Sequence, residues 1–240
     1  LLTMVIRAID YSPPVHMKFG TLLSAMVTAD AQLHPRDPFG FQRALVASFQ
    51  AYGIRHASKG TAAWNEFDAA AISVSRVRFE SMQHDVDEMF RFVFENRTAL
   101  RLSDHAFMRV QSVRPVVRVA PEDGFHLRET VAEVIQQVEL KAAGLARYGI
   151  KAPRGMPPDT KVTLHGGVTL IFDEFGKLRF AIGDSVLSPD NPKVQARQSE
   201  RLASLWERGH FKAGSEASRR FATVHRLRSV ARPSFAKETW

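Results

Sequence analysis

The stretch KVTLHGGVTLIFDEFGKLRFAI, residues 161–182, decides the class of the fold, because it predicts a β-hairpin. Residues 161–173 are rich in the β-branched side chains that favour strands. Asp173 to Gly176 form a turn sequence that leads into a second strand, residues 177–182. The chain is therefore expected to contain an antiparallel sheet.

Two segments upstream are expected to extend this sheet. Residues 107–119 alternate between apolar and polar side chains, and Pro115 within them indicates a sheet edge or a bulge. Residues 130–140 fit the helical period and the strand period equally well, and only their neighbours favour a strand. The number of strands therefore stays open at residues 130–140.

The first 54 residues are expected to be helical. Pro13 and Pro14 prevent a first helix from continuing past Tyr11. Apolar residues from Phe19 to Val27 recur with helical spacing and predict a second, amphipathic helix. A third helix is expected to begin at Asp37-Pro38 and to end at Gly53. Its predicted buried face consists of Phe41, Leu45, Phe49 and Tyr52.

Further helices are expected at residues 85–100 and 188–209, with a loop and a short helix at 55–80 and another short helix near 221–227. The predicted fold class is α+β, an N-terminal α-helical lobe followed by a small antiparallel β-sheet packed with helices. Four regions follow from this order: a helical lobe at 1–54, a helical connector at 55–105, a small α+β accessory domain at 106–212 and a basic C-terminal tail at 213–240.

The composition is that of a globular protein, with 45% hydrophobic and 24% charged residues among 240. The absence of cysteine excludes disulfides, thiolate nucleophiles and cysteine zinc sites. No run approaches the roughly 18 apolar residues that a membrane span needs, and Leu1 to Met4 lack the charged start of a signal peptide. We expect a soluble protein with no membrane partner, and slightly favour the cytoplasm.

The net charge of +8 is concentrated at the C-terminus. Residues 191–240 carry 11 Lys and Arg against 4 Asp and Glu, whereas residues 1–190 carry 22 against 21. This segment is either a binding module for nucleic acid or an acidic partner, or a solvated basic tail. No RNP, KH or zinc-finger motif is present and aromatic residues are sparse among the arginines. Nucleic acid is therefore not the expected partner, and the binding module remains the alternative function.

Asp30 and His34 are the candidate metal residues, and His16 precedes them in the same stretch of sequence. Asp30 and His34 lie four residues apart on one helical face, and a carboxylate that orients an imidazole is a known arrangement around metals. No third ligand is evident. A hydrogen bond or ion pair at a helix end is the favoured interpretation.

Other histidines are weaker candidates. His84 stands beside Asp85, Asp87 and Glu88, which is also what a solvated helix start looks like. His165 precedes two glycines, as in the segments that build oxyanion holes, but without a G-x-S-x-G motif we expect these glycines to serve close packing or a bulge. No H-E-x-x-H, P-loop or dinucleotide fingerprint occurs, so no catalytic or cofactor-binding residue is predicted.

Several motifs occur in a characteristic order. They are Arg7-Ala-Ile-Asp-Tyr-Ser-Pro-Pro14, Phe19-Gly20, Ala25-x-x-Thr28-Ala-Asp30 and Ala51-Tyr-Gly-Ile54. In this order they resemble the closing helices of the α-helical domain of thermolysin-like zinc peptidases, the gluzincins. Later segments, within residues 106–211, look like the accessory region of bacterial gluzincin-like proteins; they are Val110-Gln-Ser-Val-Arg-Pro115, Gly166-Gly-Val-Thr-Leu-Ile-Phe-Asp173 and Leu178-Arg-Phe-Ala-Ile182.

The resemblance implies a role without chemistry for this chain. In the family, zinc is held by the two histidines of H-E-x-x-H and a downstream glutamate, and none of these positions maps onto this sequence. Zinc is then expected only in a part upstream of Leu1, and no cofactor in this chain. The resemblance implies the non-catalytic C-terminal portion of a metallopeptidase-related protein, a scaffold or accessory region whose partner is the upstream peptidase-like region and whose parent acts on peptides or proteins. An independent hydrolase with an unrecognised histidine site is a further alternative.

Overall fold

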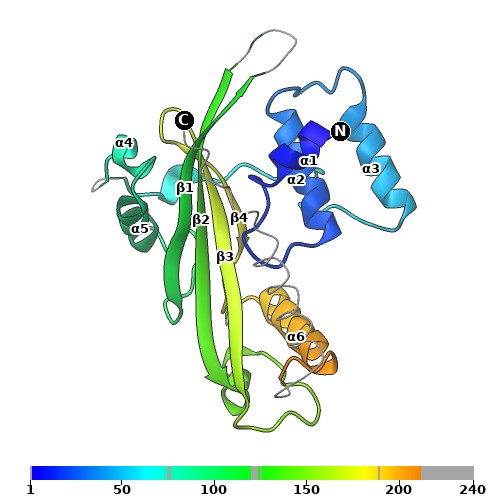
Figure 1. Ribbon diagram of the computed structural model, residues 1–240, viewed down its shortest axis with the longest axis vertical. Helices are drawn as coiled ribbons and strands as arrows, with labels where there is room; N and C mark the ends of the chain where they lie inside the picture. Colours follow the sequence, from blue (N-terminus) through cyan, green and yellow to red (C-terminus); the bar gives the residue numbers. More distant parts are fainter. Residues whose placement is uncertain (1, 75–76, 120–123, 125, 189, 212–240) are drawn as a thin grey trace, which may run out of the picture. The chain divides into compact units, whose positions relative to one another are not determined.

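The computed structural model describes residues 2–74, 77–119, 124, 126–188 and 190–211. Within them the strands form one four-stranded antiparallel sheet in the order β1-β2-β3-β4 (Figure 1). The strands are β1 (Phe107–Val119), β2 (His126–Lys141), β3 (Lys161–Asp173) and β4 (Leu178–Asp184). The α-helices are α1 (Leu2–Ala8), α2 (Phe19–Ala31), α3 (Phe41–Ala51), α4 (Phe79–Met82), α5 (Val86–Glu95) and α6 (Pro192–Glu207), and the 3-10 helices are η1 (Ala69–Ala71) and η2 (Ala142–Tyr148).

This architecture confirms the predicted α+β class. Residues 130–140, which the sequence left open, lie inside strand β2. The predicted hairpin at 161–182 is β3 and β4, and β1 is an edge strand, as Pro115 indicated. The predicted short helix near 221–227 lies outside the described residues.

The chain forms two compact units that are discontinuous in sequence. The first unit comprises Leu1–Glu139 and Thr163–Ser188, and the second comprises Leu140–Val162 and Pro189–Trp240. The expected boundaries near residues 54 and 105 both fall inside the first unit, which holds the N-terminal helices together with most of the sheet.

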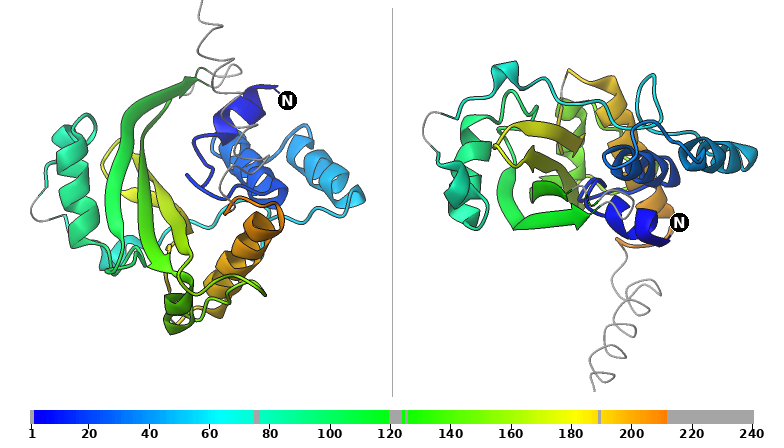
Figure 2. Two further views of the ribbon diagram at one scale, coloured as in Figure 1. Left: turned by 60° about the horizontal axis from the view of Figure 1, so that its bottom comes forward. Right: turned by 90° about the horizontal axis from the view of Figure 1, so that it is seen from above.

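Within the first unit, helices cover both faces of the sheet. Helix α5 packs on one face, where Phe92 contacts Phe172 edge to face with ring centroids 5.3 Å apart. Helices α1 and α2 pack on the other face with Ile171 and Phe180. Figure 1 and the left view of Figure 2 show α5 and the N-terminal helices on opposite sides of the strands. Neighbouring residues of β3 therefore enter different cores, as the alternation of side chains along a strand requires.

Two bulges change which side chains face which core. In β1 the register shifts between Val110 and Ser112, so that Gln111 is an extra residue. Val110 belongs to the core between the sheet and α5. Without the extra residue, the even-numbered side chains that follow Val110 in β1 would also face α5. With it, Ser112 and Arg114 face the N-terminal helices. A second shift at Arg179 lets Leu178 face one core and Phe180 the other.

The start of the third helix was predicted wrongly, and its buried face was predicted correctly only in part. Helix α3 begins at Phe41 rather than at Asp37-Pro38, because Gly40 takes a left-handed conformation with φ 68°. Asp37 still caps the helix, since its carboxylate accepts hydrogen bonds from the backbone amides of Gln42 and Arg43 at 3.2 Å each. Phe41 and Tyr52 are exposed; Leu45 and Phe49 are partly buried.

The stripe predicted for the second helix is only partly buried. Leu23, Met26 and Val27 are buried in α2, whereas Phe19 at its start is exposed. The helix nevertheless spans the predicted residues.

Candidate functional site

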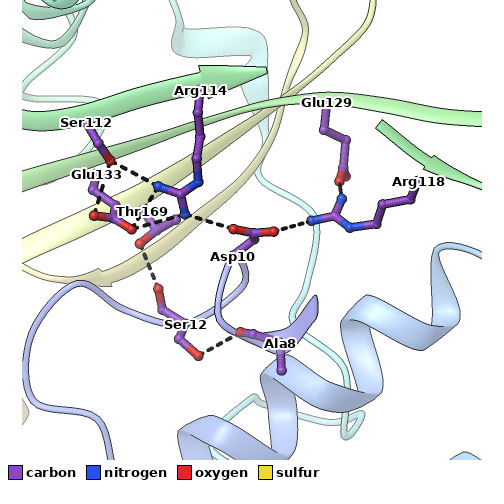
Figure 3. A network of polar contacts seen from close by, with 9 residues as sticks. All are labelled: Ala8, Asp10, Ser12, Ser112, Arg114, Arg118, Glu129, Glu133 and Thr169. Carbon is purple, nitrogen blue, oxygen red and sulfur yellow. Dashed lines mark hydrogen bonds and ion pairs between the residues drawn. The ribbon is translucent and has the colours of Figure 1, made fainter. Parts of the chain in front are cut away.

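A cluster of five charged side chains and one tyrosine connects the turn after α1 to strands β1 and β2. We call it the anchor cluster; its residues are Asp10, Tyr11, Arg114, Arg118, Glu129 and Glu133. Asp10 lies between the two arginines, with one carboxylate oxygen 2.8 Å from Arg114 Nη2 and the other 2.7 Å from Arg118 Nη2 (Figure 3). One acidic residue of the helical lobe is thus paired with two bases of the sheet.

The part of the cluster around Arg118 is buried. Arg118 forms an ion pair with Glu129, and these side chains are only 4% and 3% exposed. The Tyr11 hydroxyl donates a hydrogen bond of 2.5 Å to Glu129 Oε1. Tyr11 itself is fully buried, with its ring centroid 5.3 Å from the Arg118 guanidinium carbon.

The part around Arg114 is nearer to solvent. Arg114 lies 3.3 Å from a carboxylate oxygen of Glu133, and the Ser112 hydroxyl is bonded to the same carboxylate at 3.2 Å. Each arginine therefore bonds two carboxylates, one from the turn after α1 and one from β2.

Backbone contacts hold the turn that carries Asp10 and Tyr11. The Ser12 hydroxyl donates to the carbonyl of Ala8 at 2.8 Å, and the Ser12 carbonyl accepts from the Thr169 hydroxyl of β3 at 2.7 Å. The Trp64 indole donates to the carbonyl of Tyr11 at 2.9 Å. The bulge at Gln111 also contributes, because it directs Arg114 and Arg118 toward the face of the sheet that carries the N-terminal helices.

Burial and charge shift several pKa values in the cluster. Burial raises the pKa of the Tyr11 hydroxyl far above its usual value, and the nearby Glu129 carboxylate raises it further, so Tyr11 stays neutral and acts as a donor. Burial also raises the pKa of Glu129, although the charge of Arg118 and the hydrogen bonds from Tyr11 and Arg118 oppose this shift. For Arg114 burial acts to lower the pKa, but the bond to Asp10 and the charges of Asp10 and Glu133 raise it overall.

The chemistry of this cluster is that of a fixed ion-pair network. Its carboxylates and guanidinium groups pair with one another and thereby compensate the loss of water that burial imposes. The network joins segments that are separated by more than 100 residues. We interpret it as the anchor that holds the helical lobe on the sheet.

The structure pairs the two candidate metal residues at the end of α2. His34 Nδ1 lies 3.2 Å from one Asp30 carboxylate oxygen, and Gln42 Nε2 donates to the other oxygen at 3.0 Å. The same amide donates to the carbonyl of His34 at 2.9 Å. These contacts tie the end of α2 to the start of α3, the helix-end arrangement that the sequence favoured.

His16 lies at a different place from Asp30 and contacts His165. Its Nε2 donates to the carbonyl oxygen of His165 at 2.7 Å, and its backbone takes a left-handed conformation with φ 62°. The glycines after His165 serve close packing, since a Cβ atom on Gly166 would clash with the backbone nitrogen of Val186. The structure thus brings together two histidines that the sequence had treated separately.

The acidic group at residues 84–88 forms a helix start. The Asp85 carboxylate accepts from the amides of Asp87 and Glu88 at 2.8 and 3.3 Å, which caps α5. Glu88 also pairs with Arg91 at 3.0 Å. Among the residues that the structure describes, no three His, Asp or Glu side chains are grouped so that they could hold a metal ion.

Sequence reasoning missed the anchor cluster. Asp10 and Tyr11 stood in a motif that was noted for its order, but their partners follow more than 100 residues later. The signal that could have found them is the pair of arginines at 114 and 118 opposite the pair of glutamates at 129 and 133, each pair spaced by four on adjoining strands. Residues that are an even number of positions apart in a regular strand share one face of the sheet, so each pair is expected to point to one side.

Comparisons with family models, with curated proteins and with solved structures found no match for this chain. In the part of the chain that the structure describes, no helix has the length and apolar character to cross a membrane.

Proposed function

We propose that this chain is the non-catalytic supporting region of a gluzincin-like metallopeptidase-related protein. In this role the N-terminal helices form one wall of a larger structure, and the rest of that structure packs against α1. The proposal rests on the order of motifs in residues 1–54 and on the surface that these residues expose.

The observation that carries the proposal is an apolar stripe on α1 and the turn that follows. The stripe consists of Leu2, Val5, Ile6 and Ile9, which are between 37% and 73% exposed. Met4 and Ala8, on the opposite side of the helix, are buried in the core beneath. Helix α1 is therefore apolar on two opposite faces, a pattern typical of helices that are covered on both sides.

Exposed apolar side chains are concentrated in the helical lobe. Nine of the sixteen large hydrophobic residues that are exposed in the described part of the chain fall within residues 2–53. Such patches commonly mark protein interaction surfaces. A peptidase-like region packed on the apolar stripe would remove its four side chains from water, and each Å² of apolar surface buried in this way would stabilise the assembly by about 25 cal/mol.

The anchor cluster fits the same role. The motif that carries the resemblance, residues 7–14, uses Asp10, Tyr11 and Ser12 for contacts within the chain. The side chains of Asp10 and Tyr11 and the backbone carbonyl of Ser12 hold the lobe on the sheet.

The coding sequence upstream of Leu1 tests this proposal. We expect an H-E-x-x-H motif followed by a glutamate ligand, and the protein expressed from the whole reading frame should bind one zinc ion per chain and cleave an unfolded protein substrate in a chelator-sensitive reaction. The 240-residue chain alone should do neither. A stop codon without an intervening zinc motif would overturn the proposal.

A further inference from the structure

The second unit concentrates the positive charge of the chain. Residues 140–162 carry five Lys and Arg against one Asp, and residues 189–240 carry eleven against five, so this unit has a net charge of +10. The first unit carries 17 Lys and Arg against 19 Asp and Glu, a net charge of −2. The basic character therefore extends beyond the C-terminal segment to the connection between β2 and β3.

Helix α6 arranges part of this charge in a line. Lys193, Arg197 and Arg201 follow one another at intervals of four residues, and Arg208 continues the line just after the helix; we call these four the basic stripe. At 3.6 residues per turn they fall within an arc of about 80° and extend along about 22 Å. All four are exposed, whereas Val194, Gln198 and Leu202 on another side of the helix are buried. The exposed Glu200 and Glu207 fall about 20° and 40° outside the arc, along one edge of it.

Although the motifs of the sequence did not favour nucleic acid, the alignment of these cations on α6 does, and we propose that the basic stripe binds the phosphate backbone of a nucleic-acid duplex. A duplex carries one negative charge per about 1.7 Å of its axis, so a line of this length faces about a dozen phosphates. Cations at successive turns of a helix, about 6 Å apart, contact such a backbone without reading bases.

The exposed side chains favour a duplex over a membrane or a single strand. Within residues 140–162 and 190–211 no large hydrophobic side chain is exposed, whereas a helix that lies on a membrane presents an apolar face. Single-strand binding also uses exposed aromatic rings for stacking, and Tyr148 and Trp206 in this unit are only partly exposed. The inference is independent of the proposed function, because it concerns other residues and holds whether or not a zinc motif lies upstream.

Fluorescence anisotropy with a labelled 20-base-pair DNA duplex tests the inference on the full chain. The variant carries Lys193→Glu, Arg197→Glu and Arg201→Glu. A control with Arg36→Glu, Arg55→Glu and Lys59→Glu makes the same change in net charge on exposed residues of the first unit. The stripe variant should bind roughly tenfold or more weakly at 0.1 M salt, and the slope of log K against log salt should fall by about 2 to 3. The control should stay within about twofold of the wild type.

Three results would overturn the inference. Equal losses in the two variants would show an effect of net charge alone. Unchanged binding by the stripe variant would assign any binding to other residues. Retention on phosphatidylserine vesicles at a salt concentration that abolishes duplex binding would identify a membrane surface as the partner. Circular dichroism of both variants establishes that each is folded.

Discussion

At the scale of single residues, the anchor cluster combines a buried ion pair with a buried tyrosine. Arg118 and Glu129 are nearly inaccessible to water, and Asp10 reaches Arg118 from a segment 108 residues away in sequence. Sequence reasoning placed Asp10 and Tyr11 at a helix end but could not predict their partners. Such long-range contacts depend on the register of the strands, which local patterns do not determine.

Replacing Arg118 should strongly destabilise the protein. Arg118→Ala leaves Glu129 buried without its base, and we expect a loss of about 3 to 5 kcal/mol in the free energy of unfolding. Arg109→Ala on the same strand removes an exposed arginine and should change stability by less than about 0.5 kcal/mol. Urea unfolding followed by circular dichroism measures both. Similar values for the two variants would contradict the role of the anchor cluster.

Glu129 should give stability a specific dependence on pH. Burial raises the pKa of this carboxyl above its usual 4.5, so the folded protein holds the proton to higher pH than the unfolded chain does. The contribution of Glu129 to stability is therefore fully present below about pH 4.5 and is lost as the pH rises through the raised pKa. The amide of Glu129→Gln does not titrate in this range. The free energy of unfolding of this variant minus that of the wild type should therefore increase from pH 4.5 to pH 7.

The control for this pH dependence is Glu139→Gln, an exposed position on the same strand. Its difference from the wild type should vary less over the same range. If the difference between Glu129→Gln and the wild type is constant with pH, or decreases toward pH 7, the assigned environment of Glu129 is wrong.

At the scale of elements, the periodicity of apolar residues predicted the strands and most helices. It did not predict the bulges that determine which side chains face each core. Gln111 and Arg179 are each one extra residue in a strand, and neither is marked by glycine or by another local signal. The start of α3 was misplaced for a related reason, since Gly40 delays the helix until Phe41. Pro115, by contrast, indicated the edge position of β1 correctly, because proline has no amide hydrogen to donate to a neighbouring strand.

The close packing of β3 gives a prediction for Gly166. A side chain there would meet the backbone of Val186, which cannot rotate away, so Gly166→Ala should cost about 1 to 3 kcal/mol. At Gly144 in η2 an added Cβ atom would have no neighbouring atom within 4 Å, and Gly144→Ala should be neutral or slightly stabilising. Thermal unfolding compares the two alanine variants. A neutral Gly166→Ala would show that β3 has room at this point and would reopen a role for the His165-Gly166-Gly167 segment beyond packing.

At the scale of the whole molecule, the class of the fold followed from the sequence but the division into units did not. The second unit combines residues 140–162 with residues that begin at 189, and no composition shift in the sequence marks this association. The sequence located the basic charge at the C-terminus, and the structure places the described part of that segment, residues 190–211, in one unit with the connection between β2 and β3. The apolar stripe could not be predicted either, because the pattern of α1 shows only that it is apolar and not which face is covered.

The most direct test of the proposed function is the accessibility of the apolar stripe in the intact protein. Because this chain has no cysteine, Ile6→Cys introduces a single thiol into it, and Val117→Cys on β1 supplies an exposed control. The rate of maleimide labelling, assigned by mass spectrometry, is compared between the 240-residue chain and the protein expressed from the whole reading frame. We expect Ile6→Cys to be labelled at least about tenfold more slowly in the longer protein, because a partner buries the stripe, and Val117→Cys to be labelled at the same rate in both proteins. Equal labelling rates for Ile6→Cys in the two proteins would contradict the proposed function.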